Sequence, residues 1–306
     1  MVNSSIIKQL AKDWDGIDDY IYWSKNSINE YNEDGETFIM CLCHHFSEFE
    51  DGGGETSYFT IFYRLIDYGS DLSLTSSKGY NVFDILFMSF GYAQKEKLEE
   101  YFIFLLEYII REGKPENKFD INIKNRNNKN LLMLSIYYEC TKFALKLINW
   151  GIDVTSCDDD ENNALMYACQ EKNLILIDIL INCGIDVNHI NDINDFALVE
   201  CASNRDIECM NKLINYGSIV QYHGSWYVSV LDELINSIST TDNFRFKEKH
   251  KNMFIYLILR TKIISDKSKE FLFSLNNEEI NKYLKFNDRC KHVNDLIKIN
   301  DIYFNF

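Results

Sequence analysis

The sequence predicts an all-α solenoid of about six helix-turn-helix repeats, with helical caps at its N- and C-terminal ends. The first observation behind this fold class is that residues 130–154, 163–187 and 196–220 superimpose at a spacing of 33 residues without a gap. The second is that several columns keep this spacing together. These columns are Gly151, Gly184 and Gly217; Leu147, Leu180 and Leu213; and Leu132, Leu165 and Leu198.

Each repeat is expected to contain a short first helix, a longer second helix and an extended turn. Asn130 and Asn163 precede the first helix, where an Asn side chain can accept hydrogen bonds from unpaired backbone amides. Apolar residues then recur at helical spacing. The second helix ends at a glycine, which can adopt the left-handed conformation that stops a helix. One such pair cannot bury its apolar face alone, so the pairs must stack.

The elements follow in chain order from these columns. The repeats are predicted at about 32–72, 78–122, 126–155, 159–188, 192–220 and 226–262. The three regular ones are the third to the fifth, whereas the first, second and sixth carry insertions at 51–55, 114–118 and 239–251. Residues 1–31 and 263–306 are expected to form helical caps, because terminal units must cover the exposed core.

Composition and charge exclude several classes of protein. Hydrophobic residues make up 46% of the chain, which is enough for a packed core. The sequence contains no run of 18 apolar residues, the length needed to span a membrane. A formal net charge of −16 disfavours nucleic acid and anionic membrane surfaces as partners and leaves a basic protein open. The nine cysteines, without an apolar N-terminal leader, indicate reduced thiols in the cytoplasm.

The chain shows no phosphate-binding glycine loop and no recognised catalytic motif, so we expect no enzyme activity, no catalytic residues and no cofactor. Residues 41–45, Cys-Leu-Cys-His-His, are the one metal-like cluster. They fall on a predicted helix, where successive side chains point about 100° apart. In the other repeats, the columns of Leu42 and Cys43 hold small residues, namely Ala168 and Cys201, and Cys169 and Ala202. We therefore interpret Cys41 and Cys43 as core residues, and predict no metal site.

The repeat resembles the ankyrin repeat. Residues 184–188, Gly-Ile-Asp-Val-Asn, nearly reproduce that family's usual ending, and residues 151–154 and 69–72 match it in part. The usual opening is weaker. Its histidine position is occupied by Met40, Asp84, Met133, Met166 and Val199. The resemblance implies a non-enzymatic module that binds one specific protein and is a monomer when free.

The resemblance also implies that the partner binds to the turn tips and the concave face lined by the first helices. Carried over by position, this surface includes Tyr137, Tyr138, Asn162, Gln170, Glu171, Ser203 and Asn204. The adjacent tyrosines are the strongest anchor candidates, because tyrosine buries area at low entropic cost. Packing beneath the neighbouring repeat is an equally good explanation for them. Trp226, near the sixth turn, is a further candidate.

Charge adds a second set of candidates. Asp159 and Asp160 lie in one turn, and Asp192 and Asp195 occupy the matching turn of the next repeat. Stacking would place these turns side by side as an acidic ridge. The turn of repeat three is basic instead, with Arg126 between Lys124 and Lys129. The ridge either keeps the protein soluble or complements a basic partner.

Two functions therefore remain open at the level of sequence. One is a binding module for a specific protein, in a viral or bacterial host-directed factor, since abundant Asn, Ile and Lys with one Pro fit an AT-rich source. The other is an acidic immunity or inhibitor protein that neutralises a basic toxin or nuclease.

Overall fold

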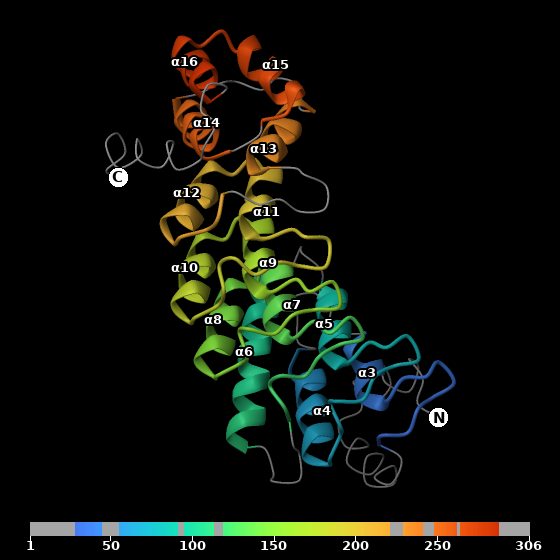
Figure 1. The fold of residues 1–306 in the computed structure, drawn as a ribbon. Helices are drawn as coiled ribbons and strands as arrows, with labels where there is room; N and C mark the ends of the chain where they lie inside the picture. The colour runs from blue at the N-terminus through green and yellow to red at the C-terminus, as the bar shows by residue number, and fades with distance from the viewer. Residues whose placement is uncertain are drawn as a thin grey trace. The chain divides into compact units, whose positions relative to one another are not determined.

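A computed structural model describes residues 28–44, 55–90, 95–112, 119–220, 229–240, 248–261 and 264–287. Within these residues the chain forms fourteen helices, which confirms the all-α repeat architecture (Figure 1). The chain divides into an N-terminal unit, residues 1–159, and a C-terminal unit, residues 160–306. Each unit is described by itself. None of the described helices is long and apolar enough to cross a membrane.

The N-terminal unit stacks three helix pairs in chain order. The pairs are α3 (Phe38–Cys43) with α4 (Glu55–Asp67), α5 (Val82–Phe90) with α6 (Lys95–Glu112), and α7 (Leu131–Tyr137) with α8 (Thr141–Asn149). The first helices pack on one another, α3 on α5 and α5 on α7, and α6 packs on α8. First helices and second helices therefore form separate rows within this unit (Figure 1).

The C-terminal unit stacks four pairs. They are α9 (Ala164–Gln170) with α10 (Leu174–Asn182), α11 (Ala197–Ser203) with α12 (Ile207–Asn215), α13 (Val230–Ser239) with α14 (Glu248–Arg260), and α15 (Asp266–Ser274) with α16 (Glu278–Asn287). The last pair lies in the segment expected to be the C-terminal cap. It stacks like a further repeat, because α15 packs on α13 and α16 packs on α14.

Helix capping in the regular repeats confirms the local reading of the sequence. The Asn130 side chain accepts a hydrogen bond from the Met133 amide at 3.0 Å, and Asn163 accepts one from Met166 at 3.1 Å. Gly151 ends its second helix with a φ of +83°, in the region that strains any residue with a Cβ. The leucine columns face inward, and all six leucines named above are fully buried.

Two buried aspartates, one in each unit, tie neighbouring repeats together. In α13, Asp232 accepts hydrogen bonds from Ser229 Oγ at 2.8 Å, Ser265 Oγ at 2.7 Å and Ser268 Oγ at 2.5 Å. In α5, Asp84 accepts from the Asn81 amide at 3.0 Å and from Asn125 Nδ2 at 2.8 Å. Asp232 thus connects the sixth repeat to α15, and Asp84 connects the second repeat to the turn of the third.

Several expectations concern segments outside the described residues. These are most of the N-terminal cap (residues 1–27), the greater part of the three insertions, Trp226, and the chain after residue 287. The predicted repeat boundaries that fall there stay predictions.

Candidate partner-binding surface

The turn of repeat three is built by its asparagines. The Asn125 side chain accepts hydrogen bonds from the backbone amides of Asn127 and Lys129, both at 3.0 Å. Asn128 adopts a positive φ of 57°, which asparagine tolerates better than most residues. A short antiparallel bridge between Lys124 and Asn130 closes the turn. The turn tip that carries Arg126 is therefore fixed by local hydrogen bonds.

Arg126 is exposed but held in place. Its guanidinium lies 4.6 Å from the centroid of the Tyr80 ring and donates a 2.8 Å hydrogen bond from Nη1 to the Lys78 carbonyl. The backbone of Gly79 approaches Arg126 so closely that an added Cβ would lie 2.8 Å from Arg126 Cβ. Gly79 also has a φ of +78°, so this contact requires glycine twice over. The second repeat thus positions the charged tip of the third.

The two adjacent tyrosines lie in different surroundings. Tyr138 is half-buried, and its ring stacks on Phe87 of α5 with centroids 4.9 Å apart. Burial raises the pKa of its hydroxyl, with smaller contributions from Tyr137, Asp84 and Tyr80. Tyr137 keeps 40% of its surface exposed, and the centroid of its ring lies 5.5 Å from Lys129 Nζ. Packing beneath the neighbouring repeat therefore describes Tyr138, while Tyr137 stays available at the surface.

In the C-terminal unit, Asp160 lies beside the acidic turn that contains Asp192 and Asp195. The Asp192 amide donates to the Asp160 carbonyl at 3.2 Å, and both residues are exposed. Asn162 stabilises this arrangement, because its Oδ1 accepts from Asn191 Nδ2 at 2.8 Å. Asp159 belongs to the N-terminal unit, where it accepts a hydrogen bond from Asn128. The structure therefore brings Asp160 and Asp192 together, and Asp195 follows in the second turn.

The exposure of an apolar side chain in this second acidic turn was not predicted from the sequence. Ile193, between Asp192 and Asn194, is 61% exposed. Its side chain is as exposed as that of Ile175, which is also 61% exposed. In the sequence, Ile193 is visible as an apolar residue within a polar turn. The sequence alone does not show whether the side chain of such a residue points outward or folds back into the core.

Gln170 and Ser203, both candidate binding residues, contact carboxylates. Ser203 Oγ donates to Glu233 Oε1 at 2.8 Å, and Gln170 hydrogen-bonds to Glu200. Burial raises the pKa of the Glu200 carboxyl, and the neighbouring Asp195 and Glu233 raise it further, while the Gln170 hydrogen bond lowers it. Burial and Glu233 likewise raise the pKa of Asp195. Asp195, Glu200 and Glu233 form what we call the carboxylate cluster.

Glu171 and Asn204 have a more local role. Each follows the last residue of a first helix, and its backbone amide caps that helix: Glu171 donates to Tyr167 and Asn204 to Glu200, both at 3.0 Å. Both residues are half-buried. They lie beside the candidate surface, but their backbone serves helix termination.

The cysteine–histidine segment does not assemble a metal centre among its described residues. Cys41 and Cys43 lie in the core of α3. Burial, aided by Glu36, raises the pKa of the Cys41 thiol to about 12, and burial raises that of Cys43 as well. Protonated thiols are poor metal ligands and poor nucleophiles. The exposed His44 lies 2.9 Å from Glu36 instead.

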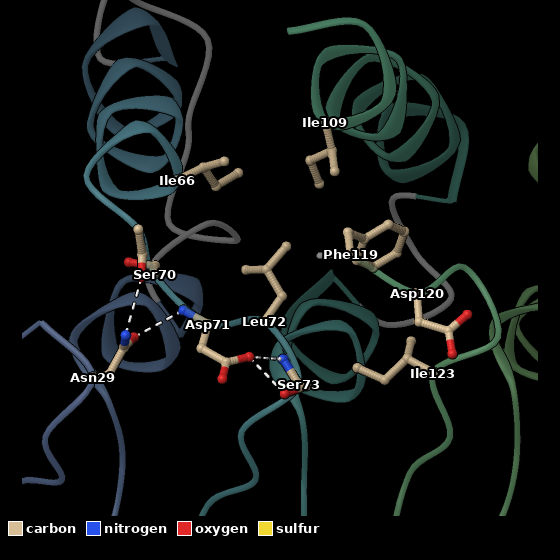
Figure 2. Close-up of a pocket in the computed structure, with 11 residues that line it drawn as sticks. Asn29, Ile66, Ser70, Asp71, Leu72, Ser73, Ile109, Phe119, Asp120 and Ile123 are labelled. Atoms are coloured by element: carbon tan, nitrogen blue, oxygen red, sulfur yellow. Dashed lines mark hydrogen bonds between the residues drawn. The ribbon is translucent and has the colours of Figure 1, made fainter. Parts of the chain in front are cut away.

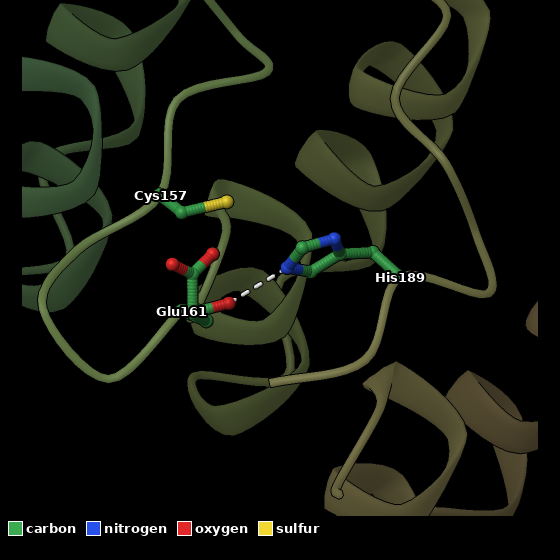
Figure 3. A group of neighbouring side chains, drawn as sticks. All are labelled: Cys157, Glu161 and His189. Atoms are coloured by element: carbon green, nitrogen blue, oxygen red, sulfur yellow. Dashed lines mark hydrogen bonds between the residues drawn. The ribbon is translucent and has the colours of Figure 1, made fainter. Parts of the chain in front are cut away.

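Figure 3 shows Cys157, Glu161 and His189, a second set of side chains of metal-ligand type. Cys157 belongs to the N-terminal unit, whereas Glu161 and His189 both belong to the C-terminal unit. His189 Nε2 lies 2.7 Å from the Glu161 backbone carbonyl. A carbonyl can only accept, so this nitrogen carries a proton and has no lone pair for a metal ion. The contact joins neighbouring turns.

A cavity of about 530 Å³ lies on the second-helix side of the N-terminal unit, between α4 and α6 (Figure 2). Ile66, Leu72 and Phe119 point into it. The carboxylates at its rim are occupied by their own turns: Asp71 accepts from Ser73, and Asp120 accepts from the Asn122 amide at 2.9 Å. The cavity therefore has a mixed polar and apolar lining, in which both aspartates are already hydrogen-bonded within their own turns.

A family model for ankyrin repeats in three copies matches residues 55–191 and 145–224, which together make up more than half of the chain. The protein belongs to the ankyrin-repeat family. A search of curated proteins found no match. Ankyrin repeats generally mediate protein–protein interactions and are typically non-enzymatic.

The ankyrin register also shows how the carboxylate cluster could have been found. Glu200 and Glu233 are separated by 33 residues and occupy the same column of successive first helices. Tyr167 precedes them in that column. A column that changes from an aromatic residue to two acids indicates a charged strip along the first-helix side. This signal is visible in the sequence once the sixth repeat is aligned with the fifth.

Proposed function

We propose that this ankyrin-repeat protein is a non-enzymatic binding module for one specific protein, acting as a viral or bacterial host-directed factor. The observation that carries the proposal is Ile193, which is 61% exposed within the acidic turn of Asp192 and Asp195. An apolar tip surrounded by charge has the composition of an interface anchor with a polar rim. Tyr137 supplies a comparable exposed anchor in the N-terminal unit.

A second candidate function is that of an acidic immunity or inhibitor protein for a basic toxin or nuclease. The carboxylate cluster favours it. Within the described part of the chain, none of its three members forms an ion pair with a lysine or arginine. Mutual repulsion among the three would be relieved by a cationic partner, which makes the cluster suited to a basic surface.

The surroundings of the module are part of the proposal. The eight cysteines that the structure describes are all free thiols, which supports a reducing, cytoplasmic location. We further propose that the protein is a monomer when it has no partner.

The test is capture of the partner from the native extract by the tagged full-length chain, with low-salt and high-salt washes. Ile193→Asp should abolish capture of a partner that survives high salt. Replacing Asp195, Glu200 and Glu233 with Asn or Gln should abolish capture of a basic partner that salt releases. Glu208→Gln, on the exposed part of α12, is the matched control. Capture that neither variant weakens would show that the partner binds elsewhere on the protein, whereas no specific capture at either salt concentration contradicts both functions.

A further inference from the structure

A second cavity opens on the first-helix side of the N-terminal unit, between repeats one and two. It measures about 370 Å³, within the usual range for ligand pockets of about 300 to 1,000 Å³. Tyr80, Ile85 and Met88 provide its apolar lining. Met88 lies on α5 and keeps 44% of its surface exposed, although the other large apolar residues of that helix are buried. Methionine is common at surfaces that accept varied apolar side chains.

The rim of this cavity is positively charged. Lys78 lines it, and Arg126 stacks on the Tyr80 ring that forms part of its wall. Neither cation forms an ion pair with a carboxylate of the described residues. Glu36 is the acidic residue of the lining, and it is already hydrogen-bonded to His44 at 2.9 Å. Lys78 and Arg126 therefore outnumber the single carboxylate of the lining, Glu36, which leaves the rim with a net positive charge.

Arg126 is positioned in advance, which lowers the entropic cost of binding. Arg126 is fixed by the Lys78 carbonyl and Asn127 Oδ1, and its turn is fixed by Asn125. Asp84 anchors Asn125 from α5, the helix that also carries Met88. A planar guanidinium held in this way can bind a carboxylate through two parallel hydrogen bonds. The apolar pocket and the cationic rim thus belong to one rigid assembly.

We propose that this groove binds an acidic peptide segment of a partner protein, with one apolar side chain in the Met88 pocket and a carboxylate on Arg126. The inference rests on the proposed protein-binding function and names the chemistry of one contact. This groove is distinct from the carboxylate cluster. The cluster is acidic and suits a basic partner, whereas the groove has a basic rim and suits an acidic one. A single-stranded nucleic acid fits less well, since Arg126 already covers the Tyr80 ring, and Ile85 and Met88 offer bases no stacking face.

The test is a selection from a random peptide library displayed on phage, with the full-length chain as bait and the Lys78→Glu/Arg126→Glu double variant as counter-bait. We expect enriched peptides to be acidic and to share one Leu, Met or Phe. Synthetic copies, measured by fluorescence anisotropy, should bind the double variant and Met88→Asp at least about tenfold more weakly than the wild type, equivalent to about 1.4 kcal/mol. Lys285→Glu, exposed on α16, is the control for a change of net charge and should bind normally.

Three outcomes overturn the groove: no enrichment over the counter-bait, enrichment of basic peptides, or tighter binding of a polyuridine oligonucleotide that displaces the peptide. Failure of the groove is distinguishable from failure of the binding function. If the double variant still captures the native partner while no peptide is enriched, the groove is wrong and the function stands. If peptides bind but no native partner is captured, the groove stands and the proposed function does not.

Discussion

Asp84 in the second repeat and Asp232 in the sixth occupy the same position of the ankyrin register, the third residue of the first helix. Each forms the same reciprocal cap with the residue before the helix, Asn81 or Ser229. Both are almost fully buried. Yet the pKa of Asp84 is raised from its ordinary value, whereas that of Asp232 is lowered.

The difference comes from the neighbours in space. Burial is the largest influence on both carboxyls and raises both pKa values. At Asp232, hydroxyl hydrogen bonds from Ser265, Ser268 and Ser229 more than offset burial. At Asp84, the Asn125 amide, the Asn81 backbone and the charges of Arg126 and Lys129 offset only part of it. The charged form of Asp232 is therefore stabilised and that of Asp84 is destabilised, although the two occupy the same position of the repeat. The reason is that the next repeat supplies different hydrogen-bond donors in each case.

The largest effect should follow from removing Asp232, the carboxylate with more hydrogen-bond donors. Asp232→Ala leaves the Ser268 hydroxyl, which is 1% exposed, without its acceptor and should lower the free energy of unfolding by about 3 kcal/mol. Hydrogen exchange should accelerate first in α15 and α16. Urea unfolding followed by circular dichroism measures the loss, and Glu270→Ala, exposed on α15, should change it by less than about 0.5 kcal/mol. Equal effects of the two variants would show that Asp232 holds nothing in place.

Neutral replacements should separate the two aspartates directly. At pH 7, Asp232→Asn should cost about 2 kcal/mol, because it removes a stabilised charge and two acceptor sites. Asp84→Asn should cost less than about 1 kcal/mol, because the folded state already disfavours its charge. The same urea unfolding measures both. A larger loss at Asp84 would reverse the comparison and contradict the assigned pKa directions.

A single donor can be removed to make Asp232 resemble Asp84. Ser268→Ala should cost about 1 to 1.5 kcal/mol and raise the Asp232 pKa, because one hydrogen bond to the carboxylate is lost. Carbon-13 NMR titration of the Asp232 carboxyl reports the pKa. Ser274→Ala, whose exposed hydroxyl bonds only its own helix, is the matched control and should leave that pKa unchanged. An unchanged pKa in Ser268→Ala would remove the serine hydroxyls from the explanation.

The smallest effect is the pH dependence, and it should have opposite signs at the two sites. A pKa that is higher in the folded than in the unfolded state stabilises the protein at pH values below the unfolded pKa, and this stabilisation is lost as pH rises through the folded pKa. The wild type should therefore become more stable relative to Asp84→Asn as pH falls from 7 towards 4. A lowered pKa gives stability that is lost as pH falls through the folded value, so wild type should lose its advantage over Asp232→Asn below pH 4. Each difference should be under about 1.4 kcal/mol per unit of pKa shift. Parallel pH profiles would contradict the comparison.

Much of the fold could be predicted from the periodic columns. The Asn130 and Asn163 caps follow from residue type and register, because a helix start needs an acceptor near its free amides. Gly151 is likewise predictable, because only glycine takes that conformation without strain. Asp84 was visible only as a departure from the usual histidine. Its partner Asn125 lies 41 residues away, in a turn whose contact with α5 no local pattern reveals.

The candidate surface was predicted less completely. Arg126 and Tyr137 follow from turn position, but the split between Tyr137 and Tyr138 depends on Phe87 of the preceding repeat. Of the carboxylate cluster, Asp195 was a predicted surface residue, but Glu200 and Glu233 were missed although they share a column. The Met88 groove has no counterpart in the sequence pattern, because an apolar residue on a helix has the same appearance whether it is covered or left open.

The sequence by itself determined the repeat, its helices and their caps, because these depend on residues within one period of the chain. It also set the sign of the charge in each turn. Only the tertiary structure decided which apolar side chains, such as Ile193 and Met88, stay exposed. It also decided that one buried aspartate is stabilised as a carboxylate and the other is not. The physical reason is that exposure and pKa depend on atoms supplied by the neighbouring repeat, and stacking alone brings those atoms together.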